Sequence, residues 1–266
     1  MDTSDTVFHA LHHHGLLILP NVADAGGARL VEQRGSKAVA TSSAAVAWSH
    51  GYQDGNQLPL PLLSSTLQSI ARVISVPLTV DIEAGYSDDL QQVAGVIEAV
   101  IGAGAVGINL EDGYGSPDLL ARKIETARQV ADIRGVKLFI NARTDVYLKN
   151  LVPAESRLAE TLKRAAQYQA AGADGLFAAG MSEPTEIAGL CCGTSLPVNL
   201  LSREGLPSPQ ALQALGVRRL TAGSSIAEFL YGAMGSLASG FLQNGQLETQ
   251  HLKAFSYGEL NALMAP

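Results

Sequence analysis

The sequence predicts a single α/β domain folded as a (β/α)8 barrel, a TIM barrel, with extra helices at its C-terminus. The length of 266 residues is typical of one such barrel. Apolar residues make up 47% of the chain and charged residues 16%, which indicates a folded protein with a large core. Eight short β-rich runs recur along the chain, and helical patterns separate them.

Each predicted strand is a short run of apolar and β-branched residues that starts near a glycine or another small residue and ends in polar side chains. The eight runs cover residues 15–21, 35–42, 76–81, 104–111, 135–143, 172–178, 196–200 and 216–222. Strands that alternate with helices favour an all-parallel sheet. Eight such units fit a closed barrel, and an open, doubly wound sheet is the alternative.

Three of the stretches between these strands have a clear helical pattern: residues 88–101, 118–133 and 155–170. In the first, apolar residues recur at spacings of three and four. The second follows Ser116 and Pro117, a common start signal, and the third ends before Gly172, a common stop. We expect these helices to cover the outside of the sheet.

Residues 225–266 extend beyond what the last helix of a barrel requires. An apolar stripe at helical spacing runs through them, formed by Phe229, Leu230, Met234, Leu237 and Phe241. We expect one or two closing helices here and a contact with another subunit. The chain has no low-complexity linker, so residues 1–266 are predicted to form one domain.

The charge balance excludes some classes of partner. The chain has 18 basic and 25 acidic residues and a net charge of −7, which argues against nucleic acid or an anionic membrane surface. No apolar run reaches the roughly 18 residues that a membrane span needs. The acidic start, residues 1–5, is wrong for a secretory signal, and the two cysteines, Cys191 and Cys192, are adjacent. A cytoplasmic location is therefore predicted.

Active sites of such barrels lie at the carboxyl ends of the strands. Polar residues that can carry chemistry follow the predicted strands at Asn21, Ser42, Ser43, Asp81, Glu83, Glu111, Asp112, Asn141, Arg143, Asp145, Asn199, Ser224 and Ser225. Several carboxylates would thus gather around one arginine.

Three of these carboxylates suggest a metal site. Asp81 and Glu83 are two residues apart, so on a continuing strand they face the same side, and Glu111 can approach from the next strand. Crowded carboxylates are costly to bury without a cation, and oxygen ligands alone suit Mg²⁺ or Mn²⁺. Arg143 is predicted to bind a substrate carboxylate. Helix capping by the acids, and an ion pair between Arg143 and Glu111, are the structural alternatives.

The same residues carry a family resemblance. The segments Val80–Tyr86, Gly107–Asp112 and Asn141–Asp145, with Pro20–Asp24 and Thr41–Ala47 before them, resemble the strand ends of the isocitrate lyase/phosphoenolpyruvate mutase superfamily. The match runs in the same order from about residue 8 to 240. It implies a (β/α)8 barrel, often with a last helix swapped between subunits of a homodimer or homotetramer. It also implies Mg²⁺ or Mn²⁺ and chemistry through the enolate of a small 2-oxo acid.

The resemblance assigns roles to individual residues. Asp81 is similar to the direct metal ligand of the family. Asp54, Glu83 and Glu111 are similar to acids that hold the metal through water. Arg143 resembles the clamp on the substrate carboxylate. The remaining substrate-binding residues are expected to be Ser42, Ser43, Ala44 and Asn199.

The loop after the fourth predicted strand departs from the family pattern. Isocitrate and methylisocitrate lyases have a Lys-[Lys/Arg]-Cys-Gly-His loop there, whereas residues 112–118 contain no Cys, His or Lys. The longer lid of the phosphonate-cleaving relatives is also absent. Only Tyr114 is left in this loop as a catalytic base. Decarboxylation of an oxaloacetate-like acid needs no strong base, so we expect a lyase of this kind.

Other functions remain open at this point. They are a methylisocitrate or isocitrate type of lyase, a phosphonopyruvate or phosphoenolpyruvate mutase type of enzyme, retro-aldol or hydrolytic cleavage, and a catalytically idle homologue that binds a 2-oxo acid. Gly223–Ser225, at the start of the last helix, is a candidate anion site and suggests a phosphate-handling barrel as a rival. No lysine ends a predicted strand, which argues against a Schiff-base aldolase.

Overall fold

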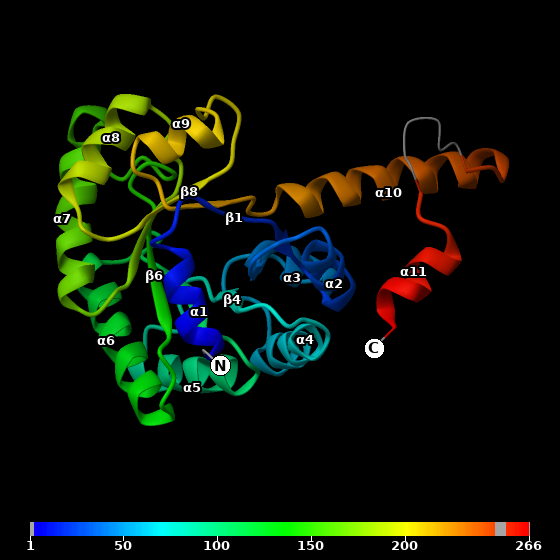
Figure 1. Ribbon diagram of the computed structural model, residues 1–266, viewed down its shortest axis with the longest axis horizontal. Coiled ribbons are helices and arrows are strands. Elements are labelled where there is room, and N and C mark those ends of the chain that lie inside the picture. The colour runs from blue at the N-terminus through cyan, green and yellow to red at the C-terminus, as the bar shows by residue number, and fades with distance from the viewer. Residues whose placement is uncertain (1–2, 248–253, 266) are drawn as a thin grey trace.

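The computed structural model, which describes residues 3–247 and 254–265, is a nearly closed barrel of nine parallel strands surrounded by helices (Figure 1). The strands are β1 (Leu17–Leu19), β2 (Asn21–Val22), β3 (Val39–Thr41), β4 (Leu78–Asp81), β5 (Gly107–Glu111), β6 (Phe139–Thr144), β7 (Gly175–Ala178), β8 (Val198–Leu201) and β9 (Arg219–Thr221). Their order around the sheet is β1-β9-β8-β7-β6-β5-β4-β3-β2. The predicted (β/α)8 class is confirmed.

The first predicted strand is divided in two at Pro20. A proline has no N–H group and interrupts a ladder of hydrogen bonds. Leu17–Leu19 pairs with β9, whereas Asn21–Val22 pairs with β3. The two halves therefore join the first and last units of the barrel, and each of the eight predicted runs contains a strand.

Eight helices lie between the strands of the described chain, and three of them match the helices predicted at residues 88–101, 118–133 and 155–170 to within two residues at each end. The eight are α2 (Ala25–Gln33), α3 (Ser43–Ser49), α4 (Leu60–Val73), α5 (Leu90–Gly102), α6 (Pro117–Arg134), α7 (Arg157–Ala170, after the 3-10 turn Ala154–Ser156), α8 (Pro184–Gly193) and α9 (Pro209–Ala214). Ser116 caps α6 by accepting a hydrogen bond from the Asp118 N–H, and Gly135 ends it in the left-handed conformation. Buried apolar side chains of these helices pack against the strands and form the main core.

The amino-terminal end of the barrel is closed by α1 (Ser4–Leu11). Phe8 is fully buried and meets the ring of Phe139 edge to face, with the ring centroids 5.5 Å apart. Gly107 begins β5 directly beside it, and a Cβ atom at this position would lie 2.5 Å from the Phe8 ring. A small residue is therefore required there, and the opposite end of the barrel is left for the site.

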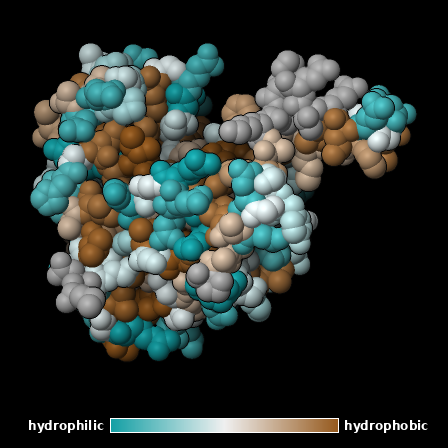
Figure 2. All heavy atoms as spheres, turned by 45° about the vertical axis from the view of Figure 1, so that its right-hand side comes forward, coloured by the Kyte–Doolittle hydropathy of each residue, from teal (hydrophilic) through white to brown (hydrophobic). Residues whose placement is uncertain are grey.

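The C-terminal segment leaves the barrel. Helix α10 (Ser225–Asn244) has no buried residue and projects outward as an arm, and α11 (Tyr257–Met264) packs with Leu263 against α2 (Figure 1). Figure 2 shows exposed apolar side chains on this arm. On the barrel, Ile18 of β1 is 53% exposed.

Within the described part of the chain, none of the helices is long and apolar enough to cross a membrane.

Candidate active site

Two adjoining cavities open at the carboxyl ends of the strands. The larger has a volume of about 490 Å³ and the smaller about 270 Å³. Ser43, Asp54, Arg143 and Leu148 line both, so the two cavities are direct neighbours. Every residue to which the sequence analysis assigns a catalytic, metal-binding or substrate-binding role, except Asn199, lines one or both of them.

The smaller cavity brings predicted substrate-binding residues together with Asp81, the predicted direct metal ligand. Asp81, Ser42 and Ala44 line it. The Ser43 hydroxyl donates a hydrogen bond to Asp81 Oδ2 at 3.2 Å. The Ser42 hydroxyl instead caps α3 by accepting from the Ala45 N–H at 3.3 Å. Ser42 thus shapes the turn that presents its two neighbours.

Asn199 lies deeper than predicted. It is the second residue of β8, and its side chain is fully buried inside the barrel, in register with Arg219 of β9. Arg219 donates to Asn109 Oδ1 at 3.3 Å, and the same oxygen accepts from Asn141 at 2.9 Å. These side chains form a polar layer beneath the cavities.

The backbone that carries Asp81 and Glu83 differs from the expected continuous strand. Strand β4 ends at Asp81, and Glu83 adopts the left-handed conformation with φ 53°, which is strained for a residue other than glycine. The expected continuing strand is therefore wrong. The Glu83 carboxylate accepts a hydrogen bond from the Asn56 N–H, while its Oε1 is buried without a hydrogen-bond partner among the described residues.

These carboxylates resist ionisation. Burial raises the pKa of Glu83 to about 7; the Asn56 N–H opposes this rise, and the charges of Asp54 and Asp81 add to it. Burial likewise raises the pKa of Glu111 to about 8, against the lowering effect of Arg143. Burial also raises the pKa of Asp81. A cation placed among these groups would favour their charged forms.

The donor set fits a magnesium site of a particular kind. Across residues 3–247 and 254–265, no three His, Cys, Asp or Glu side chains are grouped closely enough to ligate one ion directly. Mg²⁺, however, usually keeps several waters and takes only one or two carboxylates. Asp81 as a direct ligand, with Asp54, Glu83 and Glu111 acting through water, agrees with this preference. The unpartnered Oε1 of Glu83 is available for such a water.

Arg143 of β6 makes the ion pair with Glu111 that the sequence left as a structural alternative, and it also binds Asp145. Its Nη1 lies 2.7 Å from Glu111 Oε2, and its Nε and Nη2 bind the two oxygens of Asp145 at 2.7 and 3.1 Å. Its guanidinium also lines both cavities. Burial lowers the pKa of Arg143, but Glu111 and Asp145 outweigh this and raise it, so the group stays charged.

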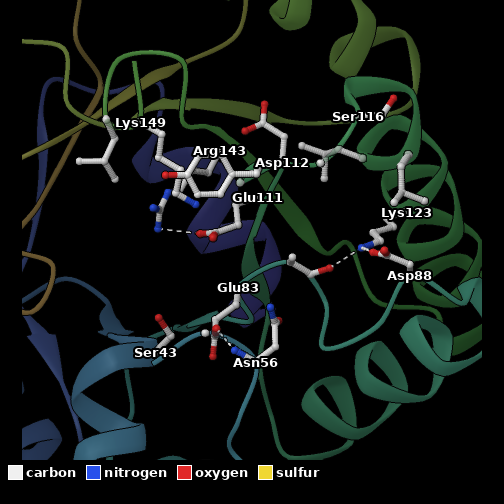
Figure 3. A pocket seen from close by; sticks show the side chains of 18 of the residues that line it. Ser43, Asn56, Glu83, Asp88, Glu111, Asp112, Ser116, Lys123, Arg143 and Lys149 are labelled. Carbon is white, nitrogen blue, oxygen red and sulfur yellow. Dashed lines mark hydrogen bonds and ion pairs between the residues drawn. The ribbon is translucent and has the colours of Figure 1, made fainter. Parts of the chain in front are cut away.

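Lys149 is a residue that the sequence analysis did not single out. Its Nζ lies 2.9 Å from Asp145 Oδ2 and 4.6 Å from the centre of the Tyr114 ring. Figure 3 shows Lys149, Arg143 and Glu111 on one side of the larger cavity, and Ser43, Glu83 and Asn56 on the other. No clear sequence signal marked Lys149, because it lies in the turn after β6 and not in a helix or at a strand end.

The loop between β5 and α6 is anchored at one end and exposed at the other. Asp112 is completely enclosed: its carboxylate accepts from Arg164 at 2.8 Å, from Tyr168 at 2.7 Å and from the Asp145 N–H at 2.9 Å. Tyr114, two residues later, lines the larger cavity and is 81% exposed. Asp112 therefore serves the structure, while Tyr114 faces solvent at the cavity mouth.

Comparison with known families identifies the kind of barrel. The family model for phosphoenolpyruvate phosphomutase matches residues 8–242. The chain belongs to the phosphoenolpyruvate phosphomutase family. An uncharacterized protein of Mycobacterium tuberculosis is 34% identical to this member over 222 residues, which cover 82% of this chain and 81% of that protein.

Solved structures agree with this family. A Burkholderia cenocepacia protein assigned as a phosphonomutase is 40% identical, with a TM-score of 0.84, and the match covers 90% of this chain and 100% of that one. A second protein of that organism, assigned as a lyase or mutase, is 31% identical, with a TM-score of 0.88 over 99% and 96% of the two chains. Membership confirms the resemblance to a superfamily of magnesium-dependent lyases and mutases, and the prediction of an enzyme.

Two further similarities involve proteins with named activities. An oxaloacetate decarboxylase of Rhodopseudomonas palustris is 29% identical over 154 residues, which cover 54% of this chain and 50% of that enzyme. A phosphonopyruvate hydrolase in complex with oxalate and Mg²⁺ is 22% identical, with a TM-score of 0.84 over 98% and 95% of the two chains. The second similarity concerns the fold alone.

Proposed function

We propose that the protein is a Mg²⁺-dependent lyase that cleaves a carbon–carbon bond of a small 2-oxo acid, and that it does so by decarboxylation. The observation that carries this proposal is the placement of Arg143 along both cavities beside Asp81, next to a loop without a Cys, His or Lys. The half-length similarity to an oxaloacetate decarboxylase supports it.

The residues that line the two cavities have distinct roles in the proposed reaction. Mg²⁺ held by Asp81, with Asp54, Glu83 and Glu111 around it, would polarise the 2-oxo carbonyl and stabilise the enolate. Arg143, fixed by Glu111 and Asp145, binds the carboxylate of the oxo-acid end. Ser43 and Ala44 orient that end in the smaller cavity.

The reaction balances without a protein base. The bond between C3 and the departing carboxylate breaks, its electron pair forms the enolate, and CO₂ leaves. A proton from water then adds to C3. The larger cavity, with exposed Tyr114 at its mouth, gives water access to this carbon.

Phosphonomutase chemistry is the second candidate, because the 40% identical structure is assigned to it. The short loop at residues 112–116 is the feature against it, since exposed Tyr114 leaves the cavity mouth open to water. A reactive phosphoryl group needs a site that excludes water. We therefore include phosphonopyruvate as a test substrate.

The deciding experiment measures pyruvate formed from oxaloacetate with Mg²⁺ by the wild type, Asp81→Asn and the control Asp132→Asn, which alters an exposed acid on α6. We expect Asp81→Asn to lower the enzymatic rate by roughly a hundredfold or more, because it removes the direct ligand. The control should match the wild type.

Free Mg²⁺ decarboxylates oxaloacetate slowly, so the variant also sets the background. Equal rates for wild type and Asp81→Asn would exclude a metal-dependent decarboxylase. Turnover of phosphonopyruvate alone would favour the second candidate. Binding of 2-oxo acids without any turnover would identify the chain as an idle homologue.

We also propose that the protein acts as a homodimer or homotetramer in the cytoplasm. The exposed arm α10 and the uncovered Ile18 on β1 support a contact with a second copy, with helix exchange between subunits as one arrangement. The two cysteines, Cys191 and Cys192, are free, which suits a reducing compartment.

A further inference from the structure

The proposed reaction on oxaloacetate uses only part of the available space. The smaller cavity has a volume of about 270 Å³, which is enough for a molecule as small as oxaloacetate. The larger cavity of about 490 Å³ lies beside it and shares four lining residues with it. Even with a hydrated metal ion at Glu83 and Glu111, much of this volume has no assigned role.

One cation of the larger cavity also has no assigned role. Of the three cationic side chains that line it, Arg143 belongs to the carboxylate clamp. Lys123 is 3% exposed, and its ammonium binds the Ala84 carbonyl at 2.8 Å and Asp88 at 2.9 Å, so it holds the loop after β4. Lys149 keeps 25% of its side chain exposed, and Asp145 is its ion-pair partner. An ammonium group has three donor hydrogens, so it can bind a further anion.

The position of this ammonium is fixed before any ligand arrives. Asp145 is completely buried and binds Arg143 with both oxygens and Lys149 with one of them. The ring of Tyr114 lies 4.6 Å from the Lys149 ammonium and stabilises it from another side. One buried carboxylate thus sets the spacing of two cations, one facing both cavities and one facing only the larger. Preorganised groups bind at a lower entropic cost than mobile ones.

We propose that Lys149 anchors an additional carboxylate of the substrate, so that the preferred substrate is a 2-oxo acid larger than oxaloacetate. The oxo-acid end lies in the smaller cavity beside Asp81 and Arg143, and a chain or branch with the additional carboxylate reaches into the larger one. This inference rests on the proposed function for the orientation of the substrate. It adds a specificity-determining residue and a substrate class.

The anchored carboxylate is a different one from the carboxylate that leaves as CO₂. A cation bound to the departing group would stabilise charge that disappears during the reaction, and this raises the barrier. The carboxylate at Lys149 therefore stays on the product. The bond between C3 and the carboxylate attached to it breaks, CO₂ leaves, the electron pair forms the enolate, and a proton from water adds to C3.

Equilibrium binding tests this without turnover. The probes are oxalate, 2-oxoglutarate and 2-oxoadipate. Each of the last two is compared with an analogue in which an isopropyl group replaces the distal carboxylate. They are titrated into the Mg²⁺-loaded wild type, Lys149→Met and Lys149→Arg. We expect the wild type to bind at least one diacid about tenfold or more tightly than its analogue, since a carboxylate–ammonium pair forms.

The variants separate anchoring from other roles. Lys149→Met should reduce the diacid preference to about threefold or less, Lys149→Arg should retain most of it, and oxalate should bind all three proteins alike. A wild type without diacid preference would overturn the proposal. So would a Lys149→Met variant that loses oxalate binding equally, because Lys149 would then act only through Asp145 and Arg143.

Steady-state kinetics gives a second readout, with a substrate that carries the departing carboxylate on C3 as well as the oxo-acid end and the distal carboxylate. If Lys149 anchors the substrate, its replacement changes mainly KM. If Lys149 donates a proton, its replacement changes kcat and the pH profile of kcat, and this result would contradict the proposal. Unchanged thermal midpoints establish that the variants are folded. Inactivity of the wild type toward oxaloacetate would count against the proposed decarboxylation and would leave the binding result intact.

Discussion

The protonation states of Glu83 and Glu111 affect both the stability of the protein and its binding of a metal ion. Both carboxyls are buried beside other acids, and burial raises their pKa values to about 7 and about 8. In the metal-free protein they keep protons that the unfolded chain loses near pH 4.5, so their effect on stability becomes unfavourable as the pH rises toward 8. A divalent cation bound beside the two carboxylates favours their charged forms and so offsets this loss of stability.

Magnesium affinity is therefore expected to rise with pH. Below pH 6 both carboxyls are protonated and Mg²⁺ must displace the protons, whereas at pH 8 Glu83 is already ionised. We expect the affinity to rise by about tenfold or more between pH 6 and pH 8, with proton release on binding. Calorimetric titration in buffers of different ionisation enthalpy measures both quantities.

The variant Glu83→Gln tests which residue is responsible. It should bind Mg²⁺ more weakly and with a shallower pH dependence, while Asp132→Asn should behave as the wild type. An affinity that is constant across this range would show that these carboxyls do not take part in binding.

At the scale of elements, the eight strand runs, the three periodic helices and the parallel (β/α)8 barrel class were predictable from the sequence. Strand-end position also predicted which residues meet, because parallel strands bring their carboxyl ends to one edge. The division at Pro20 and the turn at Glu83 were not predictable, since a left-handed glutamate depends on contacts such as that with Asn56.

Two residues illustrate what limited the site prediction. Asn199 lies two residues before the end of β8, and at this position its side chain is buried within the barrel below the cavities at the strand ends. Lys149 lies in the connection after β6, and its position depends on the buried carboxylate of Asp145. The sequence does not define the path of such a connection, so proximity to the cavity became evident only in three dimensions.

The contact between α1 and β5 gives a stability prediction for two glycines. Gly107→Ala places a Cβ atom 2.5 Å from the Phe8 ring and should lower the free energy of unfolding by about 1–3 kcal/mol, because the core there is already filled. Gly95, inside α5, has no atom within 4 Å of the corresponding Cβ position. Gly95→Ala should raise the same quantity by about 0.5–1 kcal/mol.

Urea unfolding of both variants provides the measurement. The opposite signs make each variant the control for the other. A Gly107→Ala protein as stable as the wild type would mean that α1 does not close the barrel in solution.

For the whole molecule, the arm α10 exposes apolar area that a monomer rarely leaves uncovered. Phe229, 82% exposed on this arm, is expected to lie in the contact between copies. Phe229→Asp should convert the oligomer to monomers, because a charge buried in an apolar contact is costly. Ile133, also 82% exposed but on α6, gives the matched control Ile133→Asp.

Light scattering coupled to size-exclusion chromatography measures the mass of each protein. The control should keep the mass of the wild type. A monomeric wild type at micromolar concentration would exclude the arm as a subunit contact.

The pairing of Leu17 with Arg219 has a consequence for synthesis of the chain. A ribosome makes β1 before the other strands that the structure describes and β9 after them, so the barrel cannot close until the chain has emerged as far as Thr221. Until then, the row of β1 backbone groups that pairs with β9 lacks its neighbour, and such unpaired edges associate readily with other chains. Pro20 interrupts this edge after only three residues, which shortens the surface open to mispairing while translation is still in progress.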